Sequence, residues 1–73
     1  FNKNFISDDS KTLIENRLTS KELEVVYLML EGLTNDAIAN ELNITSRTLK
    51  AHVSSIFSKL HVNDRVSLIL LLR

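Results

Sequence analysis

One stretch of the chain carries side chains suited to binding a polyanion. Basic, small and hydroxyl residues recur there at the spacing of one helical face, namely Arg47, Lys50, Ala51, Ser54 and Ser58, and residues 46–60 contain no carboxylate. Arg and Lys donate to guanine acceptors or phosphate oxygens, and small side chains let a helix approach the floor of the DNA major groove. The face therefore favours contact with double-stranded DNA, with a merely solvated surface as the alternative.

The opposite face of the same stretch is apolar. Leu49, Val53, Ile56, Phe57 and Leu60 follow the i, i+4, i+7, i+8, i+11 spacing of an amphipathic helix. A threonine at position 45 can accept from the first-turn amides as the N-cap. The pattern predicts a helix over about residues 46–60.

Two further helices are expected before it. Thr19 and Glu22 form a capping box that begins a helix over residues 20–31, and Gly32, the only glycine, stands where a left-handed residue ends a helix. The expected buried side chains of that helix are Leu23, Val26, Tyr27 and Leu30. Thr34 caps a shorter helix over residues 35–42, and Asn43 can end it. A turn of about three residues then joins residues 35–42 to residues 46–60, which is the plan of a helix-turn-helix.

The two ends of the chain differ in their expected structure. Asn63 is expected to cap a last helix over residues 64–73, which is apolar nearly all round and therefore expected to be covered on more than one side. Residues 1–17 favour a linker with one nascent helical turn, with a short helix as the alternative; Phe5 and Ile6 precede that turn. The start at Phe1 rather than Met suggests a piece of a longer protein, although processing or disorder would produce the same start.

Composition limits the fold to packed helices. The 73 residues include no Cys, no Pro and one Gly, which excludes disulfides and argues against sandwiches and barrels, since these need frequent turns. Two His without Cys argue against a structural zinc. No apolar run has the length of a membrane span and no signal peptide is visible, so we expect a cytoplasmic all-α, four-helix domain over residues 18–73.

The net charge of zero conceals an uneven distribution. Residues 1–43 carry four Lys/Arg against eight Asp/Glu, a net −4, whereas residues 44–65 carry four Lys/Arg against one Asp, a net +3. A nucleic-acid-binding domain is normally more basic, so the net charge of zero argues mildly against that function. The uneven distribution of charge along the chain argues for it.

An enzymatic function is not expected. Ser54 and Ser55 lie near His52, but side chains two or three residues apart on a helix do not form an oriented nucleophile and base without a cleft. No glycine-rich loop is present to hold a nucleotide. We expect no cofactor and no metal.

The run LTSKELEVVYLMLEGLTNDAIANELNITSRTLKAHVSSIFSKLHVNDR (residues 18–65) resembles the LuxR-type, or NarL/FixJ-type, DNA-binding domain. The matching positions are Leu18, Thr19, Glu22, Glu24, Val25, Gly32, Asn35, Ile38, Ala39, Leu42, Ile44, Thr48, Lys50, His52, Ile56, Lys59, Leu60, Val62 and Arg65. The resemblance covers residues 18–73. It implies a helix-turn-helix domain whose third helix enters the major groove of promoter DNA.

The resemblance also implies site residues and partners. Lys50, Ala51 and Ser54 match groove-facing positions, and Thr45, Thr48, His52 and Ser55 lie at or near positions that meet the DNA backbone. We expect Arg47, Lys59 and Arg65 to orient the domain on DNA. A dimer contact is expected through Val66, Ile69 and Leu70 of the last helix. The implied partners are promoter DNA, a second copy of the chain, RNA polymerase and an N-terminal receiver or sensor domain, with no membrane.

Three residues depart from the family pattern. Asp36 replaces a lysine frequent in the family, His61 replaces a glycine after the third helix, and Ser54 stands where some members carry Lys. We expect these changes to affect affinity more than fold, and His61 to adopt a left-handed conformation. Asp36 and the zero net charge keep a second hypothesis open, a protein-interaction module with little DNA affinity. For the last helix, packing within the chain is the alternative to dimerisation.

Overall fold

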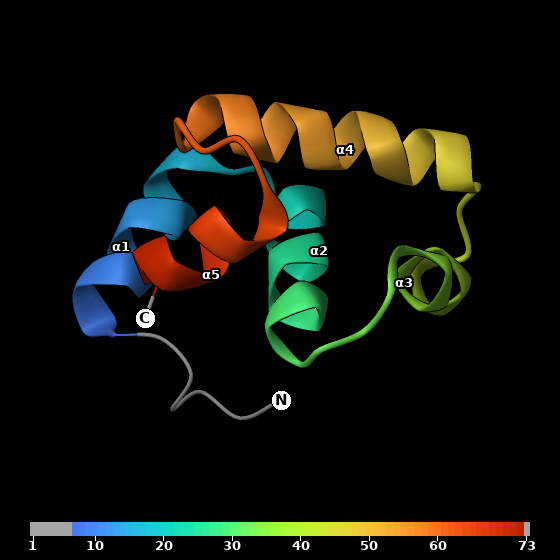
Figure 1. Cartoon of the computed structure of the whole chain (residues 1–73), viewed down its shortest axis with the longest axis horizontal. Coiled ribbons are helices and arrows are strands. Elements are labelled where there is room, and N and C mark those ends of the chain that lie inside the picture. Colours follow the sequence, from blue (N-terminus) through green and yellow to red (C-terminus); the bar gives the residue numbers. More distant parts are fainter. Residues whose placement is uncertain (1–6, 73) are drawn as a thin grey trace.

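The computed structural model of the chain describes residues 7–72, and within this range it contains five α-helices and no strand (Figure 1). The helices are α1 (Asp8–Arg17), α2 (Ser20–Leu30), α3 (Asn35–Leu42), α4 (Ser46–Lys59) and α5 (Arg65–Leu72). The predicted all-α fold is confirmed. None of the helices in the described range has the length and apolarity needed to cross a membrane.

Each helix begins at a polar N-cap side chain. Thr19 and Glu22 form the predicted capping box, and Thr34 and Thr45 accept from the amides of the third residue of their helices. The prediction that Asn63 caps the last helix is wrong, because Asp64 Oδ1 accepts from the amide of Ser67 at 2.7 Å. A carboxylate at this place forms a charge-assisted hydrogen bond and lies at the positive end of the helix dipole.

Helices α2, α3 and α4 share one kind of C-terminal turn. Gly32, Asn43 and His61 have φ angles of 92°, 55° and 57°, as the sequence predicted for all three. The amide of the next residue then donates to the carbonyl five residues before it: Leu33 to Leu28 at 3.2 Å, Ile44 to Ala39 at 3.0 Å, and Val62 to Phe57 at 3.0 Å. These are Schellman motifs, and each one turns an apolar residue back onto the core.

The segment before α2 is a helix of ten residues rather than a linker. Its anchor is Ile14, which is fully buried, as is Leu72 of α5. Two hydrogen bonds join α1 to the end of α5: Ser10 Oγ donates to the Leu71 carbonyl and the Ser7 amide to the Leu72 carbonyl, both at 3.4 Å. Only one of the two buried residues of α1, Ile14, is apolar, and one buried apolar side chain in a polar segment gives little hydrophobic periodicity, which is why the sequence favoured a linker. Phe5 and Ile6 lie outside the described residues.

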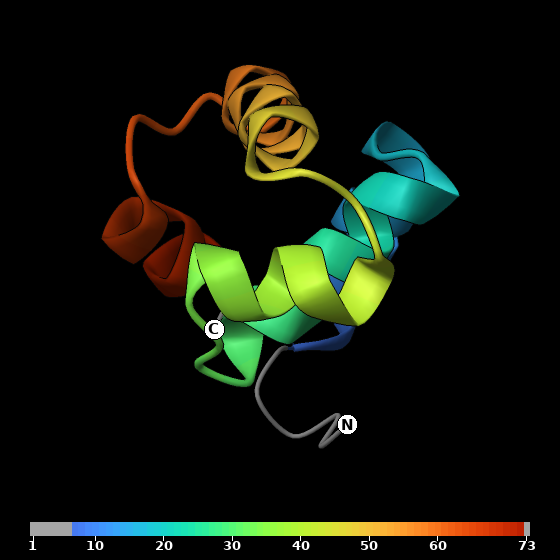
Figure 2. The same cartoon turned by 90° about the vertical axis from the view of Figure 1, so that its right-hand side faces the viewer.

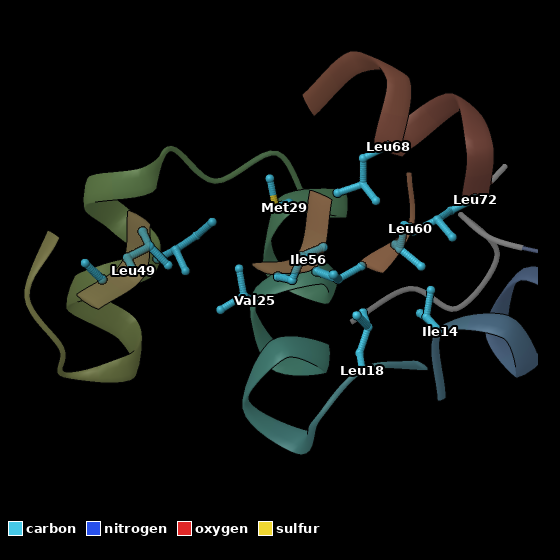
Figure 3. Close-up of a cluster of buried hydrophobic side chains, with 12 residues drawn as sticks. Ile14, Leu18, Val25, Met29, Leu49, Ile56, Leu60, Leu68 and Leu72 are labelled. Atoms are coloured by element: carbon cyan, nitrogen blue, oxygen red, sulfur yellow. The ribbon is translucent and has the colours of Figure 1, made fainter. Parts of the chain in front are cut away.

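The core runs through the molecule from the α3–α4 contact to the α1–α5 contact (Figure 3). Near one end Leu49 of α4 lies beside α3, and at the other Ile14, Leu60 and Leu72 gather. The buried face of α2 lies between these ends and is formed by Val25, Val26 and Met29. The buried face of α2 is therefore rotated about the helix axis relative to the face expected from the sequence. Of the four residues expected to be buried, only Val26 is, while Leu23, Tyr27 and Leu30 pack on the core from its edge.

Helices α3 and α4 form the predicted helix-turn-helix. Asn43, Ile44 and Thr45 make the turn between them, and α3 crosses the N-terminal end of α4 (Figures 1 and 2). Both helices also pack on α2, so that α4 lies along one long side of the molecule (Figure 1). This arrangement holds α4 by one face and leaves another face uncovered.

Candidate nucleic-acid interface

The uncovered face of α4 is formed by the residues that the sequence singled out. Arg47, Lys50, Ala51, Ser54 and Ser58 are all exposed, and we call them the α4 stripe. The rotation of α4 is fixed by the opposite face, where Leu49, Ile56 and the adjoining Leu60 are buried. The burial pattern thus presents the small and basic side chains outward along one helix.

The beginning of α4 adds donors to this face. Thr45 Oγ1 accepts from the Thr48 amide at 3.1 Å and donates to the Thr48 hydroxyl at 3.0 Å, and both residues are exposed. The amides of Ser46 and Arg47 belong to the first turn, where a helix offers no internal acceptor. Open amides at the positive end of a helix dipole favour an anion such as phosphate.

Charges on the two helices of the motif differ in sign. Within residues 7–72, neither Arg47 nor Lys50 has an ion pair or a side-chain hydrogen bond. Asp36, however, lies exposed in the first turn of α3, where a carboxylate suits the helix dipole. The α4 stripe is therefore positive, whereas the start of α3 is negative.

Lys59 is engaged within the molecule. Its ammonium lies 2.7 Å from Oε1 of Glu22, whose side chain is 5% exposed. Ser55, one helical turn before Lys59, faces the same carboxyl group and helps to lower its pKa. The structure thus directs two residues predicted to contact DNA toward α2, away from the α4 stripe.

The Glu22 carboxylate is strongly stabilised in its charged form. Burial alone would raise its pKa, but hydrogen bonds from Lys59, Ser55 and the Thr19 amide, with the positive charge of Lys59, lower the pKa from 4.5 to about 2. Sequence reasoning assigned Glu22 only a capping role. One signal in the sequence could have revealed the contact between the helices. Ser55 and Lys59 lie one turn apart on the same helix, and both side chains can donate hydrogen bonds to a carboxylate such as that of Glu22.

Arg65 is also occupied internally. Its guanidinium donates to the carbonyl of Met29 at 3.3 Å and to the carbonyl of Leu33. Met29 lies in the last turn of α2, where a cation is favoured by the helix dipole, and Leu33 lies in the connection that follows this helix. Arg65 therefore holds the start of α5 against the end of α2. His52, the remaining residue predicted to contact DNA, is half-buried on α4.

The last helix has both a covered and an open side. Leu68 and Leu72 are fully buried, whereas Val66 and Leu70 are 66% and 61% exposed and Ile69 is half-buried. Leu71, which the sequence did not select, is 42% exposed and extends the same open side. Packing within the chain thus accounts for one side of α5 and leaves an apolar patch of Val66, Ile69, Leu70 and Leu71.

Comparison with known proteins identifies a family pattern over most of the chain. The family described as bacterial regulatory proteins, luxR family, matches residues 16–72. The chain is 52% identical over 48 residues to the transcriptional regulatory protein LiaR of Bacillus subtilis, which covers 66% of this chain and 23% of LiaR. It is 43% identical over 53 residues to the response regulator protein VraR of Staphylococcus aureus and of Staphylococcus epidermidis, which covers 73% of this chain and 25% of VraR. The chain spans about a quarter of the length of these relatives.

Proposed function

Because the chain belongs to the LuxR family of bacterial regulatory proteins, we propose that it is the DNA-binding output domain of a transcriptional regulator. The observation that carries the proposal is the α4 stripe, whose two cations have no partner among residues 7–72 and whose small residues allow close approach of another surface. An exposed basic helix in a helix-turn-helix fits the major groove of DNA. Membership in a family of regulatory proteins also confirms that the domain is not an enzyme.

In this proposal, different residues have different tasks. Lys50 donates to a base edge or an adjacent phosphate, while Ala51 and Ser54 allow the helix to lie close to the groove floor. Arg47 and the Thr45–Thr48 turn at the start of α4 contact the sugar–phosphate backbone, and His52 lies at the margin of that contact. Lys59, Ser55 and Arg65 are left out of the proposed contacts because their polar groups are bound within the chain.

A salt titration of duplex binding tests the proposal. The two free cations of the stripe predict that log Kd changes with log salt concentration by a slope of about 2 for one domain and about 4 for two domains on paired half-sites. Lys50→Ala should cost about 1–3 kcal/mol of binding free energy if Lys50 reads guanine. Lys21→Ala, which removes an exposed lysine on α2, is the matched control and should change affinity little. No binding at low salt would instead favour the protein-interaction module, which the acidic start of α3 supports.

We further propose that two copies pair through the apolar patch of α5. Large exposed apolar residues in a cluster usually mark an interface, and Val66, Leu70 and Leu71 form one here. Pairing also compensates for weak binding by one domain, because two linked domains occupy neighbouring half-sites together. Sedimentation in the presence of paired half-site DNA should show a 2:1 complex, and Leu70→Lys should reduce its cooperativity. Independent binding of two monomers to the paired sites would exclude this interface.

The remaining partners follow from the relatives rather than from contacts in this chain. LiaR and VraR are named as a transcriptional regulatory protein and a response regulator, and the matched part is about a quarter of each. We therefore propose an N-terminal receiver or sensor domain before this domain, action at promoter DNA with RNA polymerase, and a cytoplasmic location.

A further inference from the structure

Glu22 is the point at which α2 holds the C-terminal half of α4. Resting on the DNA-binding function proposed above, we infer that Glu22, Lys59 and Ser55 are positioning residues that set how the α4 stripe is presented to a half-site. They would act on specificity through α4, without contacting a base. Lys59 Nζ lies 2.7 Å from Glu22 Oε1, and Ser55 lies one helical turn before Lys59 on α4.

The Glu22 carboxylate is itself held firmly. Its Oε1 accepts from the Thr19 amide at 2.9 Å and from Lys59 Nζ at 2.7 Å, so that the capping box and the ion pair share one oxygen. Moving the carboxylate therefore requires opening the first turn of α2. The Lys59 carbonyl also accepts from the Arg17 guanidinium of α1 at 3.4 Å, which joins a third helix to the same end of α4.

Attachment at two successive turns fixes both the tilt and the rotation of α4. Ser55 and Lys59 lie four residues apart, on one flank of the helix. Each follows a stripe residue, Ser54 or Ser58, by one position, which is a rotation of about 100° around the helix axis. A turn of α4 about its axis would therefore move the stripe and break the two attachments together.

The distance along α4 amplifies small movements. Lys59 lies twelve residues after Arg47, which is about 18 Å along a helix. A tilt of about 5° at Lys59 would displace Arg47 by about 1.6 Å, more than the range of about 0.5 Å within which hydrogen-bond distances fall. The apolar contacts of Leu49 and Ile56 are not directional, whereas charge-assisted hydrogen bonds are. The directional contacts that orient α4 thus lie at its C-terminal end, chiefly at Glu22 and also at the Arg17 contact with the Lys59 carbonyl.

Two substitutions distinguish positioning from direct contact with DNA. Glu22→Gln keeps an oxygen for the Thr19 amide but removes the charge that holds Lys59, and Lys59→Met keeps the apolar stem but removes the ammonium. The control Lys21→Met removes an exposed lysine whose ion pair with Glu24, at 3.7 Å, does not involve α4. Ser55→Ala removes one attachment without leaving a charge unpaired. It is the substitute test if Glu22→Gln or Lys59→Met unfolds.

The measurement is the ratio of two Kd values at fixed salt. One duplex is selected by the wild-type domain from a randomised pool, and the other is a scrambled duplex of the same composition. The temperature is chosen so that circular dichroism shows every variant as helical as the wild type. We expect Glu22→Gln and Lys59→Met each to reduce the specific-to-nonspecific ratio about tenfold, the effect of losing about one base contact. Lys59→Arg should restore most of the ratio, and Lys21→Met should leave it unchanged.

The variants also separate the competing explanations. If Lys59 contacts phosphate directly, Glu22→Gln would release its ammonium and strengthen binding to both duplexes, which would overturn the inference. An unchanged ratio in Glu22→Gln and Ser55→Ala would also overturn it. Failure of the wild-type domain to bind any duplex at low salt would overturn the proposed function itself, and this outcome is visible before any variant is made.

Discussion

Acid should destabilise this domain largely through one carboxylate. Glu22 has a pKa of about 2 in the folded chain, against an ordinary value of 4.5, because hydrogen bonds from Lys59, Ser55 and the Thr19 amide outweigh the effect of burial. A group whose folded pKa is depressed stabilises the fold above its unfolded pKa and loses that contribution as pH falls toward its folded pKa. The contribution of Glu22 is therefore complete above about pH 5 and is lost between about pH 4.5 and pH 2.

The magnitude follows from the two pKa values. A difference of about 2.5 pH units corresponds to about 3.4 kcal/mol at 1.36 kcal/mol per unit. Glu22 is 5% exposed, but the Lys59 side chain is 39% exposed and water screens that end of the pair, which reduces the expected contribution to about 2–3 kcal/mol. A domain of 73 residues has a total free energy of unfolding of about 4–11 kcal/mol, so this loss is a large fraction of its stability.

Urea unfolding followed by circular dichroism, repeated from pH 7 to pH 2, measures the effect. The wild-type domain and Glu22→Gln should differ by about 2–3 kcal/mol at pH 6 and converge near pH 2, since protonation and the amide both remove the charge. Glu24→Gln is the control, because its ion pair with Lys21 is exposed on both sides and is worth about 0–1 kcal/mol. Asp64, whose pKa is also lowered by hydrogen bonds from Ser67, is present in all three proteins and cancels in the comparison.

Two results of this measurement would contradict the role assigned to the Glu22 charge. A constant difference between wild type and Glu22→Gln from pH 6 to pH 2 would show that the charge of Glu22 contributes nothing and that the substitution acts through packing alone. Equal pH profiles for Glu22→Gln and Glu24→Gln would likewise refute the special role assigned to the buried carboxylate.

Three further substitutions test other parts of the argument. His61→Gly should raise stability by about 0.5–1 kcal/mol in thermal unfolding, because a left-handed non-glycine residue costs about 1–2 kcal/mol and glycine entropy offsets part of the gain. Asp36→Lys should tighten duplex binding and steepen its salt dependence, at a cost of about 0.5 kcal/mol in helix-dipole stabilisation; unchanged affinity would place the start of α3 away from DNA. Leu49→Ala should lower the free energy of unfolding by about 2–5 kcal/mol, and a loss below about 1 kcal/mol would contradict its burial.

Helix boundaries were predictable because the chemistry that sets them is local. A cap and the amide it accepts lie three residues apart, and a left-handed turn depends on one residue, so Thr19, Gly32 and Asn43 identify their own roles. Only the last cap was placed one residue early, since Asn63 and Asp64 are both good caps. The α4 stripe was predictable for the same reason, because a long helix with a clear apolar face has only one opposite face.

Tertiary contacts were not predictable from these patterns. The Glu22–Lys59 pair joins residues 37 positions apart, and the Arg65 contact with Met29 joins residues 36 positions apart. A basic residue at the margin of a helix looks the same in sequence whether it meets solvent, DNA or a buried carboxylate. The sequence favoured a linker over a short helix at α1 on similar grounds, since the stability of this helix depends on Ile14 sharing a core with Leu72 from the other end of the chain.

The structure changes what the charge distribution implies for binding. Of the four basic residues among residues 44–65, Lys59 neutralises Glu22 and Arg65 caps α2, and only Arg47 and Lys50 remain available on the α4 stripe. Long-range attraction to phosphate is then weak for one domain, because it depends on the number of free cations. We expect a protein that binds weakly by charge to obtain specificity from the placement of a few donors, and in our proposal this placement depends on Lys59, which is paired with Glu22 although its side chain is 39% exposed. Lys59 holds α4 on α2 and Arg65 holds α5 on α2, so both cations contribute to geometry instead of to free charge, and we expect pairing of two domains to restore the affinity that one domain lacks.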